Sequence, residues 1–213
     1  MKIGVIGAGY VGRTVGRLAV LAGHEVMVSN SRGPQTLFSL SHATGCKAGT
    51  VAEAVAFGEV VIVAVPLSAY QSVPVAPLAG KVVIDANNYY PARDGHIPAL
   101  DRGETTTSEL LAAHLPGARI VKAFNAIRMV DLEQDGRPAG DPDRHALPIA
   151  GDDAAGKAIA AGLLDSFGFD VVDAGSLAEG WRFEQGRPAY CVPMTRDVLL
   201  RALAETRREE VPA

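Results

Sequence analysis

Cysteine is scarce in this sequence, and its basic residues do not cluster. Cys46 and Cys191 are the only cysteines. Because they lie far apart and outside any CxxC spacing, they indicate neither a disulfide framework nor a zinc site, and we expect two buried thiols in a reducing compartment. The 20 Lys and Arg residues are outnumbered by 24 Asp and Glu residues, for a net charge of -4. Without a basic block or stripe, a surface for nucleic acid or for anionic membranes is not expected.

Membrane-spanning runs and common catalytic motifs are absent as well. No apolar run is long enough to cross a bilayer, and the chain enters its first strand without the segments of a signal peptide, so we expect a cytoplasmic protein. GxSxG, HExxH and EF-hand patterns are missing, and the five histidines are scattered. We therefore assign no catalytic side chain and no metal ligand. The 48% of hydrophobic residues among 213 is enough for the core of one domain with a modest extension.

Short β-branched runs alternate with helical segments through the first part of the chain. The runs predict strands buried on both faces at residues 3–6, 26–28, 60–65 and 82–84, with further strands near Lys47 and within 118–125. Helices are predicted between them at residues 11–22, 34–44, 50–58 and 107–117, the third opening on a Thr50 and Glu53 capping box. This alternation predicts an α/β fold with a doubly wound, mostly parallel sheet of the Rossmann type.

The pattern loosens after Asn125. Residues 133–145 are rich in Gly, Pro and Asp, and we interpret them as a surface loop or a cover over a site, without core residues. A strand at 145–151, a helix at 153–167, a strand at 169–175 and a terminal helix at 195–208 follow. The sequence thus predicts a Rossmann domain over residues 1–125 and a small α/β extension over residues 126–213, packed on the same domain.

A glycine-rich loop joins the first strand to the first helix. In the "GAGYVG" stretch, Gly7 permits the tight turn, Gly9 lets the backbone approach a pyrophosphate, and Gly12 lets the helix lie close to the strand. The free N–H groups at the start of the helix would meet the anion. A glycine-rich turn without a ligand is the alternative, which the regular strands and helices around it disfavour. The predicted binding residues here are Gly7, Ala8, Gly9, Tyr10, Val11 and Gly12.

A cation stands where an NAD site usually carries an acid. An Asp or Glu about 20 residues past the loop binds the ribose hydroxyls of NAD, whereas here that place is taken by Ser31 and Arg32. The Arg32 guanidinium would face the 2′-phosphate of NADP, and Ser31, with Ser29 or Asn30, would donate further hydrogen bonds. An ordinary exposed arginine in a turn is the alternative. We predict NADP as the cofactor.

Five motifs occur in the order "GVIGAGYVG", "SNSRGP", "VIVAVP", "IDANN" and "VKAFN". With them the chain resembles the NADP oxidoreductases that reduce coenzyme F420, and the related NADPH-binding domain of the STEAP metalloreductases, from Met1 to about Gly175. The resemblance implies a single Rossmann domain with a small C-terminal addition, in a homodimer that moves hydride between NADPH and a small-molecule acceptor. That acceptor would be F420 or a flavin, FMN or FAD.

The resemblance places Ala64, Val65 and Pro66 along the cofactor, at the end of a strand where a parallel sheet binds ligands. Asn87 and Asn125 also end strands, so their amides should converge on the same crevice and suit a carboxamide or a ring carbonyl and nitrogen. The roles of three nearby residues stay open. Asn88 is a site residue or a turn former. Asp85 and Lys122 are a structural pair or rim charges on one interpretation, and site residues on the other.

The C-terminal stretch offers a possible acceptor side. Trp181, Arg182, Arg187 and Tyr190 would suit a planar acceptor with a phosphate tail, or equally a dimer interface. Two other functions stay open. One is an NADP-dependent dehydrogenase of a small hydroxy acid that uses Lys122 and Asn125, although 63 residues from 151 to 213 look too few for its usual helical substrate domain. The other is a redox sensor that binds NADPH without turnover.

Overall fold

An eight-stranded sheet organises residues 1–208, the part of the chain that the computed structural model describes. Its strand order is β3-β2-β1-β4-β5-β6-β7-β8. The first six strands pair in parallel, in the order of a doubly wound Rossmann sheet, which confirms the predicted fold class. The strands are β1 (Lys2–Ile6), β2 (Glu25–Ser29), β3 (Lys47–Gly49), β4 (Val60–Val63), β5 (Val82–Asp85), β6 (Arg119–Lys122), β7 (Ala146–Gly151) and β8 (Asp170–Asp173).

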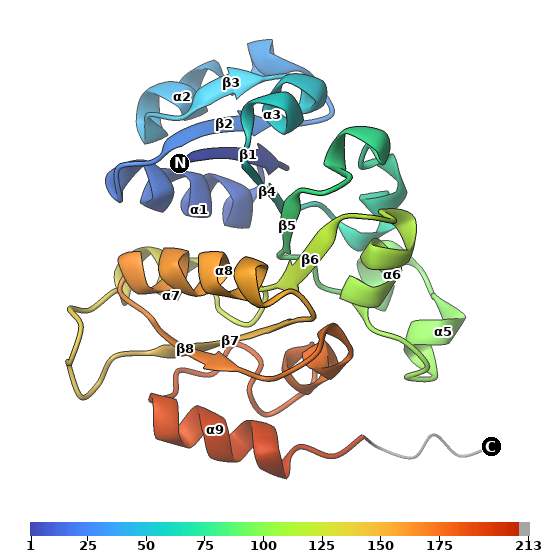
Figure 1. The fold of residues 1–213 in the computed structure, drawn as a ribbon, viewed down its shortest axis with the longest axis vertical. Helices are drawn as coiled ribbons and strands as arrows, with labels where there is room; N and C mark the ends of the chain where they lie inside the picture. Colours follow the sequence, from blue (N-terminus) through green and yellow to red (C-terminus); the bar gives the residue numbers. More distant parts are fainter. Residues whose placement is uncertain (209–213) are drawn as a thin grey trace.

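Helices cover both faces of this sheet (Figure 1). Helices α1 (Tyr10–Leu21), α7 (Met129–Gln134) and α8 (Ala154–Ser166) pack on one face, while α3 (Val51–Phe57) and α6 (Thr107–His114) pack on the other. Strand β4 shows why helices are needed on both faces. Its Val60 and Ile62 are buried in the core under α1, α7 and α8, and its Val61 and Val63 in the core under α3 and α6. The remaining helical segments are η1 (Pro34–Leu37), α2 (Phe38–Thr44), η2 (Leu67–Ser72), η3 (Ala76–Leu78), α4 (Pro91–Asp94), α5 (Pro98–Asp101), η4 (Leu177–Phe183) and α9 (Arg196–Glu205).

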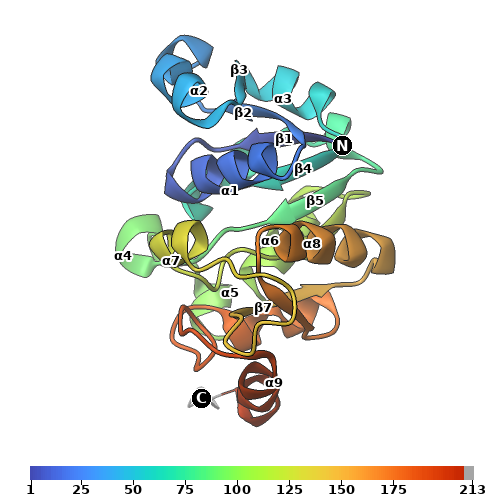
Figure 2. The ribbon, with the colours of Figure 1, turned by 90° about the vertical axis from the view of Figure 1, so that its left-hand side faces the viewer.

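The direction of the sheet reverses at its C-terminal edge. Strand β7 pairs antiparallel with β6, and β8 runs parallel to β7. Helices α8 and α9 lie on opposite sides of these two strands (Figure 1). Figure 2 shows the N-terminal strands at one end of the molecule and α9 at the other. Where the chain should be divided between a Rossmann domain and its extension stays a prediction.

Local signals correctly place several boundaries. The Thr50 hydroxyl accepts a hydrogen bond from the Glu53 amide, and the Glu53 carboxylate accepts one from the Thr50 amide, so the predicted capping box begins α3. Gly23 follows α1 with a φ of 84°, a left-handed conformation that glycine adopts without strain. Within residues 1–208 no helix is long and apolar enough to cross a membrane.

Two predictions about burial are wrong. Just before the predicted loop, the residues after Asn125, for which no element was predicted, form α7, whose Leu132 is buried against the sheet. Further along, the predicted loop buries Arg144, whose guanidinium bonds the carboxylates of Asp165 and Asp170 at 2.8 and 3.0 Å. A helix as short as α7 has too few residues for a helical repeat of apolar positions to be recognised in the sequence. Cys46 is buried as predicted, whereas Cys191 is half-exposed.

His145 should make the stability of the fold depend on pH. Burial lowers the pKa of this imidazole below its ordinary 6.5, so the unfolded chain binds a proton that the folded chain refuses. The free energy of unfolding should therefore fall as the pH is lowered from about 7 towards 5. Urea unfolding at both pH values should show a smaller decrease for His145→Gln than for the control His42→Gln, whose side chain is exposed. Equal decreases in the two variants would contradict this prediction.

Candidate functional site

The glycine loop is shaped by backbone contacts at its first and last glycines. Gly7 has a φ of 110°, and a Cβ there would lie 2.1 Å from the Ala64 carbonyl oxygen. A Cβ at Gly12 would lie 1.9 Å from the Gly7 carbonyl oxygen, so the start of α1 can approach the turn only through glycine. Both positions therefore serve packing, as the sequence predicts.

Gly9 differs from these two glycines because its Cβ would meet no protein atom within 4 Å. It precedes α1, and no side chain caps the helix. The first N–H groups of this twelve-residue helix therefore face open space with the positive end of the helix dipole behind them. This arrangement suits an anionic group such as a pyrophosphate.

A cavity of about 340 Å³ opens beside the glycine loop, at the carboxyl ends of β1, β2 and β4. Nine of the predicted site residues line it: Gly7, Ala8, Gly9, Asn30, Ser31, Arg32, Ala64, Val65 and Pro66. The sequence reasoning did not select Ile6, Val51, Ala69 and Ser72, which complete the lining. Val51, Ala69 and Ser72 come from α3 and η2, where no motif distinguishes them, and Ile6 is the last residue of β1, directly before the glycine loop.

The loop after β2 is held by its own side chains. The Asn30 amide donates to Thr36 Oγ1 at 2.9 Å and accepts from the Arg32 N–H at 3.0 Å. Ser29 is fully buried, and its hydroxyl donates to the Val5 carbonyl at 2.9 Å. The suggestion that Ser29 donates to a ligand is therefore wrong, and the Asn30 side chain, although it lines the cavity, already has partners within the loop.

Arg32 carries the charge of this cavity. Its side chain is exposed, and within residues 1–208 no carboxylate pairs with its guanidinium, while the backbone around it is fixed by Asn30 and by Gln35, whose Nε2 donates to the Arg32 carbonyl at 2.9 Å. The residues that line the cavity include no Asp or Glu. The cavity is thus electropositive, with five guanidinium donors presented from an ordered loop.

A second cavity, of about 700 Å³, lies on the other side of the glycine loop. The predicted residues Tyr10, Val11 and Asn125 line it, together with Asn88, Tyr90, Arg93, Phe124, Ile127, Arg128, Met129, Val130, Asp131, Tyr190 and Cys191. The Tyr90 and Tyr190 hydroxyls are hydrogen-bonded to each other. Burial raises the pKa of the Tyr190 phenol, so it stays neutral. The wall is mostly aromatic and apolar, which suits a planar ring.

Three asparagine side chains connect the strands behind these cavities. Asn87 Oδ1 accepts from the Val65 N–H at 2.9 Å, and Asn88 Nδ2 donates to the Asn125 carbonyl at 2.9 Å. Asn125 Nδ2 donates in turn to the Phe183 carbonyl at 3.0 Å. Among residues 1–208, Asn87 Nδ2 and Asn125 Oδ1 are buried without a partner, which is unfavourable unless something else pairs with them.

Asp85 and Lys122 belong to a buried polar network. Asp85 Oδ2 accepts from the Ser108 hydroxyl at 2.6 Å, and the Lys122 ammonium donates to Thr107 Oγ1 at 2.6 Å and to Ser108 Oγ at 3.2 Å. Lys122 also pairs with Glu184 Oε1 at 3.1 Å. Asp85 and Lys122 thus have the structural role that the sequence offered as one interpretation. They do not pair directly, because Ser108 connects them, and the ionic partner of Lys122 is Glu184, which sequence reasoning missed.

The charges of this network follow from their surroundings. Burial raises the pKa of Asp85, and the Lys122 ammonium only partly opposes this rise. Burial also opposes ionisation of Glu184, but the attraction of Lys122 and the hydrogen bonds from Thr107 outweigh it and lower the pKa of Glu184. Glu184 and Lys122 thus form the charged pair, and this pair connects the C-terminal stretch to β6 and α6.

The remaining predicted residues lie in different parts of the structure. Gly12 and Asn87 line neither cavity, and both are buried. Tyr190 lines the second cavity, whereas Trp181 and Arg187 line a third cavity. Arg182 bonds Glu179 and two backbone carbonyls. The four C-terminal residues therefore do not form one platform.

Known proteins resemble this chain in sequence and in structure. Residues 2–89 match the family described as "NADP oxidoreductase coenzyme F420-dependent". The hypothetical protein SMa0349 from Sinorhizobium meliloti is 30% identical, with a TM-score of 0.79 over 92% of this chain and 96% of that protein. The proposed F420-dependent NADP reductase from Arthrobacter sp. FB24 is also 30% identical, with a TM-score of 0.71 over 83% of this chain and 85% of the reductase.

A curated relative is matched over a shorter length. The Escherichia coli (strain K12) protein YjhV is 34% identical over 83 residues, which are 39% of this chain and 61% of YjhV. The chain thus spans less than two thirds of that relative. The family match over residues 2–89 includes the glycine loop and the loop of Arg32, which both line the first cavity. The chain belongs to the family of coenzyme F420-dependent NADP oxidoreductases, as the resemblance in its motifs predicted.

Proposed function

We propose that the protein transfers hydride between NADP(H) and a planar ring acceptor, a deazaflavin such as F420 or a flavin. The observation that supports this most is the pair of cavities on either side of the glycine loop, one electropositive and one aromatic. When bound, NADPH would supply the hydride and the acceptor ring would receive it. The protein would contribute binding and alignment, which is what transfer between two rings requires.

The first cavity fits the phosphates of NADP(H). The open space beside Gly9 and the free N–H groups of α1 would hold the pyrophosphate. Arg32 would pair with the 2′-phosphate, and the exposed Ser31 beside it would donate a hydrogen bond. The lack of an acid in the lining favours the phosphorylated dinucleotide, because a carboxylate there would repel it.

The buried asparagines suit the nicotinamide end. Asn87 Nδ2 is a donor without a partner, and Asn125 Oδ1 is an acceptor without one, within residues 1–208. A carboxamide offers the complementary pair, a carbonyl oxygen and an NH₂ group. We propose that these two atoms orient the nicotinamide at the boundary of the second cavity.

The second cavity would take the acceptor ring. Tyr10, Tyr90 and Met129 offer apolar contact, and the neutral Tyr190 adds no charge. Such walls would exclude water from the path of the hydride. The hydroxy acid alternative needs Lys122 at the substrate, but Lys122 is 0% exposed and fully engaged, which counts against it.

An assay with alternative acceptors tests the proposal. Purified protein is mixed with NADPH and separately with F420, FMN, FAD and a panel of keto acids, and loss of the nicotinamide absorbance is followed. Oxidation with a ring acceptor is expected. Turnover with a small acid alone, or tight NADPH binding without turnover with any acceptor, would contradict the proposal.

Gly9→Ala tests the pyrophosphate site without disturbing the fold. Gly9 has a φ of -73°, which alanine adopts freely, and its Cβ would point into open space. The midpoint of thermal unfolding should stay unchanged, while NADPH affinity falls about tenfold or more, as expected when a charged hydrogen bond is lost. Calorimetric titration measures the affinity. The control is Gly162→Ala in α8, also open to Cβ, which should leave NADPH affinity intact.

We further propose a cytoplasmic homodimer with contacts in the extension. Val198 and Leu200 on α9 are 40% and 45% exposed, so a second copy could cover them. Light scattering coupled to size-exclusion chromatography should give the mass of a dimer for the unmodified protein and a smaller mass for Leu200→Glu. A monomeric mass for the unmodified protein would reject the proposal.

A further inference from the structure

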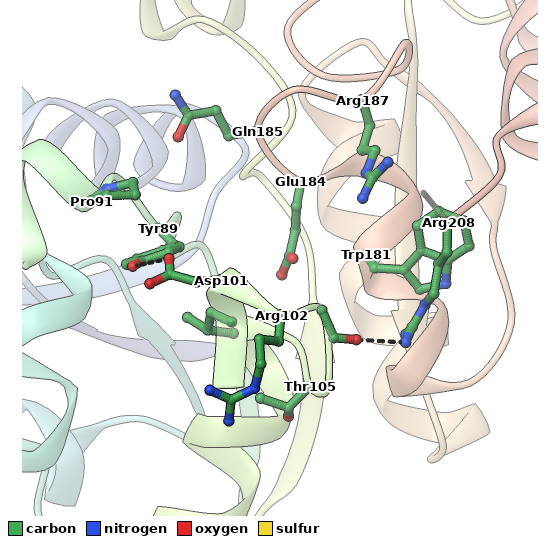
Figure 3. Close-up of a pocket in the computed structure, with 12 residues that line it drawn as sticks. Tyr89, Pro91, Asp101, Arg102, Thr105, Trp181, Glu184, Gln185, Arg187 and Arg208 are labelled. Atoms are coloured by element: carbon green, nitrogen blue, oxygen red, sulfur yellow. Dashed lines mark hydrogen bonds between the residues drawn. The ribbon is translucent and has the colours of Figure 1, made fainter. Parts of the chain in front are cut away.

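A third cavity, of about 510 Å³, lies away from the glycine loop (Figure 3). One wall comes from residues 100–105 and from Tyr89, and the other from Trp181, Arg187 and Arg208. The neighbouring residues Asn88 and Tyr90 line the second cavity instead. The backbone at residues 88–90 therefore separates the two spaces, and no residue of the proposed NADP(H) site lines the third cavity.

Three guanidinium groups surround the Trp181 indole. Those of Arg182, Arg187 and Arg208 lie 4.8, 5.2 and 5.1 Å from the ring centroid. Arg182 is neutralised, because its guanidinium bonds Glu179 at 2.5 Å and two carbonyls at 3.1 and 3.0 Å. The ring attracts each cation weakly, but it cannot neutralise the mutual repulsion of the other two guanidinium groups, those of Arg187 and Arg208.

Most donors of Arg187 and Arg208 have no partner within residues 1–208. Arg187 makes one long bond, at 3.4 Å, to the Arg207 carbonyl, and Arg208 makes one, at 2.9 Å, to the Gly103 carbonyl. Neither pairs with a carboxylate within residues 1–208. Each guanidinium has five N–H donors. Within residues 1–208, the two side chains therefore have several N–H donors along the cavity that lack an acceptor.

The acidic groups around the cavity are already engaged elsewhere. Glu184 pairs with Lys122 and accepts from Thr107. Asp101 accepts from the Tyr89 hydroxyl at 2.7 Å and contacts the His96 ring at 3.1 Å. Arg102 pairs with Glu104, and in Figure 3 its guanidinium points away from Trp181. Among the residues that the structure describes, the uncompensated charge of the cavity is thus positive, and it lies at Arg187 and Arg208.

We propose that this cavity binds a multivalent oxyanion, a phosphate or polycarboxylate group, between Arg187 and Arg208 above the Trp181 ring. The anion would be free or carried on a larger metabolite. Paired guanidinium groups match the geometry of such anions. The proposal does not depend on the function proposed for the other two cavities.

The test uses Trp181, which is the only tryptophan in the sequence, so intrinsic fluorescence reports this cavity. Protein without nucleotide is titrated with inorganic phosphate, a sugar phosphate and citrate, against sodium chloride at equal ionic strength. A saturable change with at least one oxyanion, but not with chloride, is expected. The response to each probe distinguishes a free phosphate from a carried one and from a polycarboxylate.

Substitutions locate the binding. The midpoint of the titration should rise about tenfold or more in Arg187→Gln and in Arg208→Gln, as for loss of one charged hydrogen bond. It should not change in Arg201→Gln, an exposed arginine of α9. Calorimetric titration of the same variants checks the result without fluorescence. Equal midpoints in all variants, or a chloride effect as large as that of phosphate, would overturn the proposal.

Discussion

Arg32→Glu should weaken NADPH binding about a hundredfold or more and change NADH binding by less than about threefold. The substitution removes a charge-assisted hydrogen bond worth about 1.5 to 3 kcal/mol and places a carboxylate against the 2′-phosphate. NADH lacks that phosphate, so neither effect applies to it. Because Arg32 is exposed and its guanidinium has no carboxylate partner within residues 1–208, the fold should be unaffected. Calorimetric titration with both nucleotides measures the two affinities.

Two controls separate the physical causes in this experiment. Arg32→Gln removes the cation without adding repulsion, so its loss of NADPH affinity should lie between those of the unmodified protein and Arg32→Glu. Arg201→Glu makes the same charge change on exposed α9, and it should leave both nucleotides unaffected. If Arg32→Glu weakened NADH as much as NADPH, Arg32 would not be the residue that recognises the phosphate.

Lys122→Met should lower the free energy of unfolding by about 3 to 5 kcal/mol. Methionine fills a similar volume, but Glu184 then loses its ionic partner while it remains largely buried, with 20% of its side chain exposed. The fully buried Asp85 also loses the nearby positive charge. Urea unfolding measures the change, and the control Lys47→Met removes an exposed pair with Glu25, each side chain 56% exposed, which should contribute less than about 1 kcal/mol.

A double variant tests the coupling behind this second prediction. Lys122→Met combined with Glu184→Gln leaves no unpaired charge at that position, so it should be more stable than the sum of the two single losses implies. The expected coupling identifies the pair as the cause of the effect. Additive losses would mean that Lys122 acts through packing, for instance against Gly180, where a Cβ would lie 2.7 Å from Lys122 Cδ.

The sheet and the first cavity could be predicted from sequence because their signals are local. A buried strand shows itself in four or five consecutive residues, and the glycine loop shows itself in six. Arg32 could be found because its distance along the chain from Gly12 reflects the length of one helix and one strand. These elements lie next to each other in the sequence and in the fold.

The buried network could not be predicted, because its members come from distant segments. Nothing in the residues around Glu184 indicates that its partner is Lys122 in β6, or that both meet Thr107 at the start of α6. Trp181 and Tyr190 illustrate the same limit. They are close in the sequence, yet they line different cavities, since η4 and the turn after it direct them apart.

The reversal of β7 has a consequence for how this scaffold could be altered. Because β7 runs opposite to β6, the chain leaves β6, forms α7 and returns into the sheet at the same edge, without a crossover. Residues 123–145 therefore form one continuous excursion, whose first part, between Phe124 and Asp131, lines the aromatic cavity. Insertions, deletions or grafts in this excursion would reshape one wall while six parallel strands keep their register. It is the natural place to engineer a preference for a different acceptor.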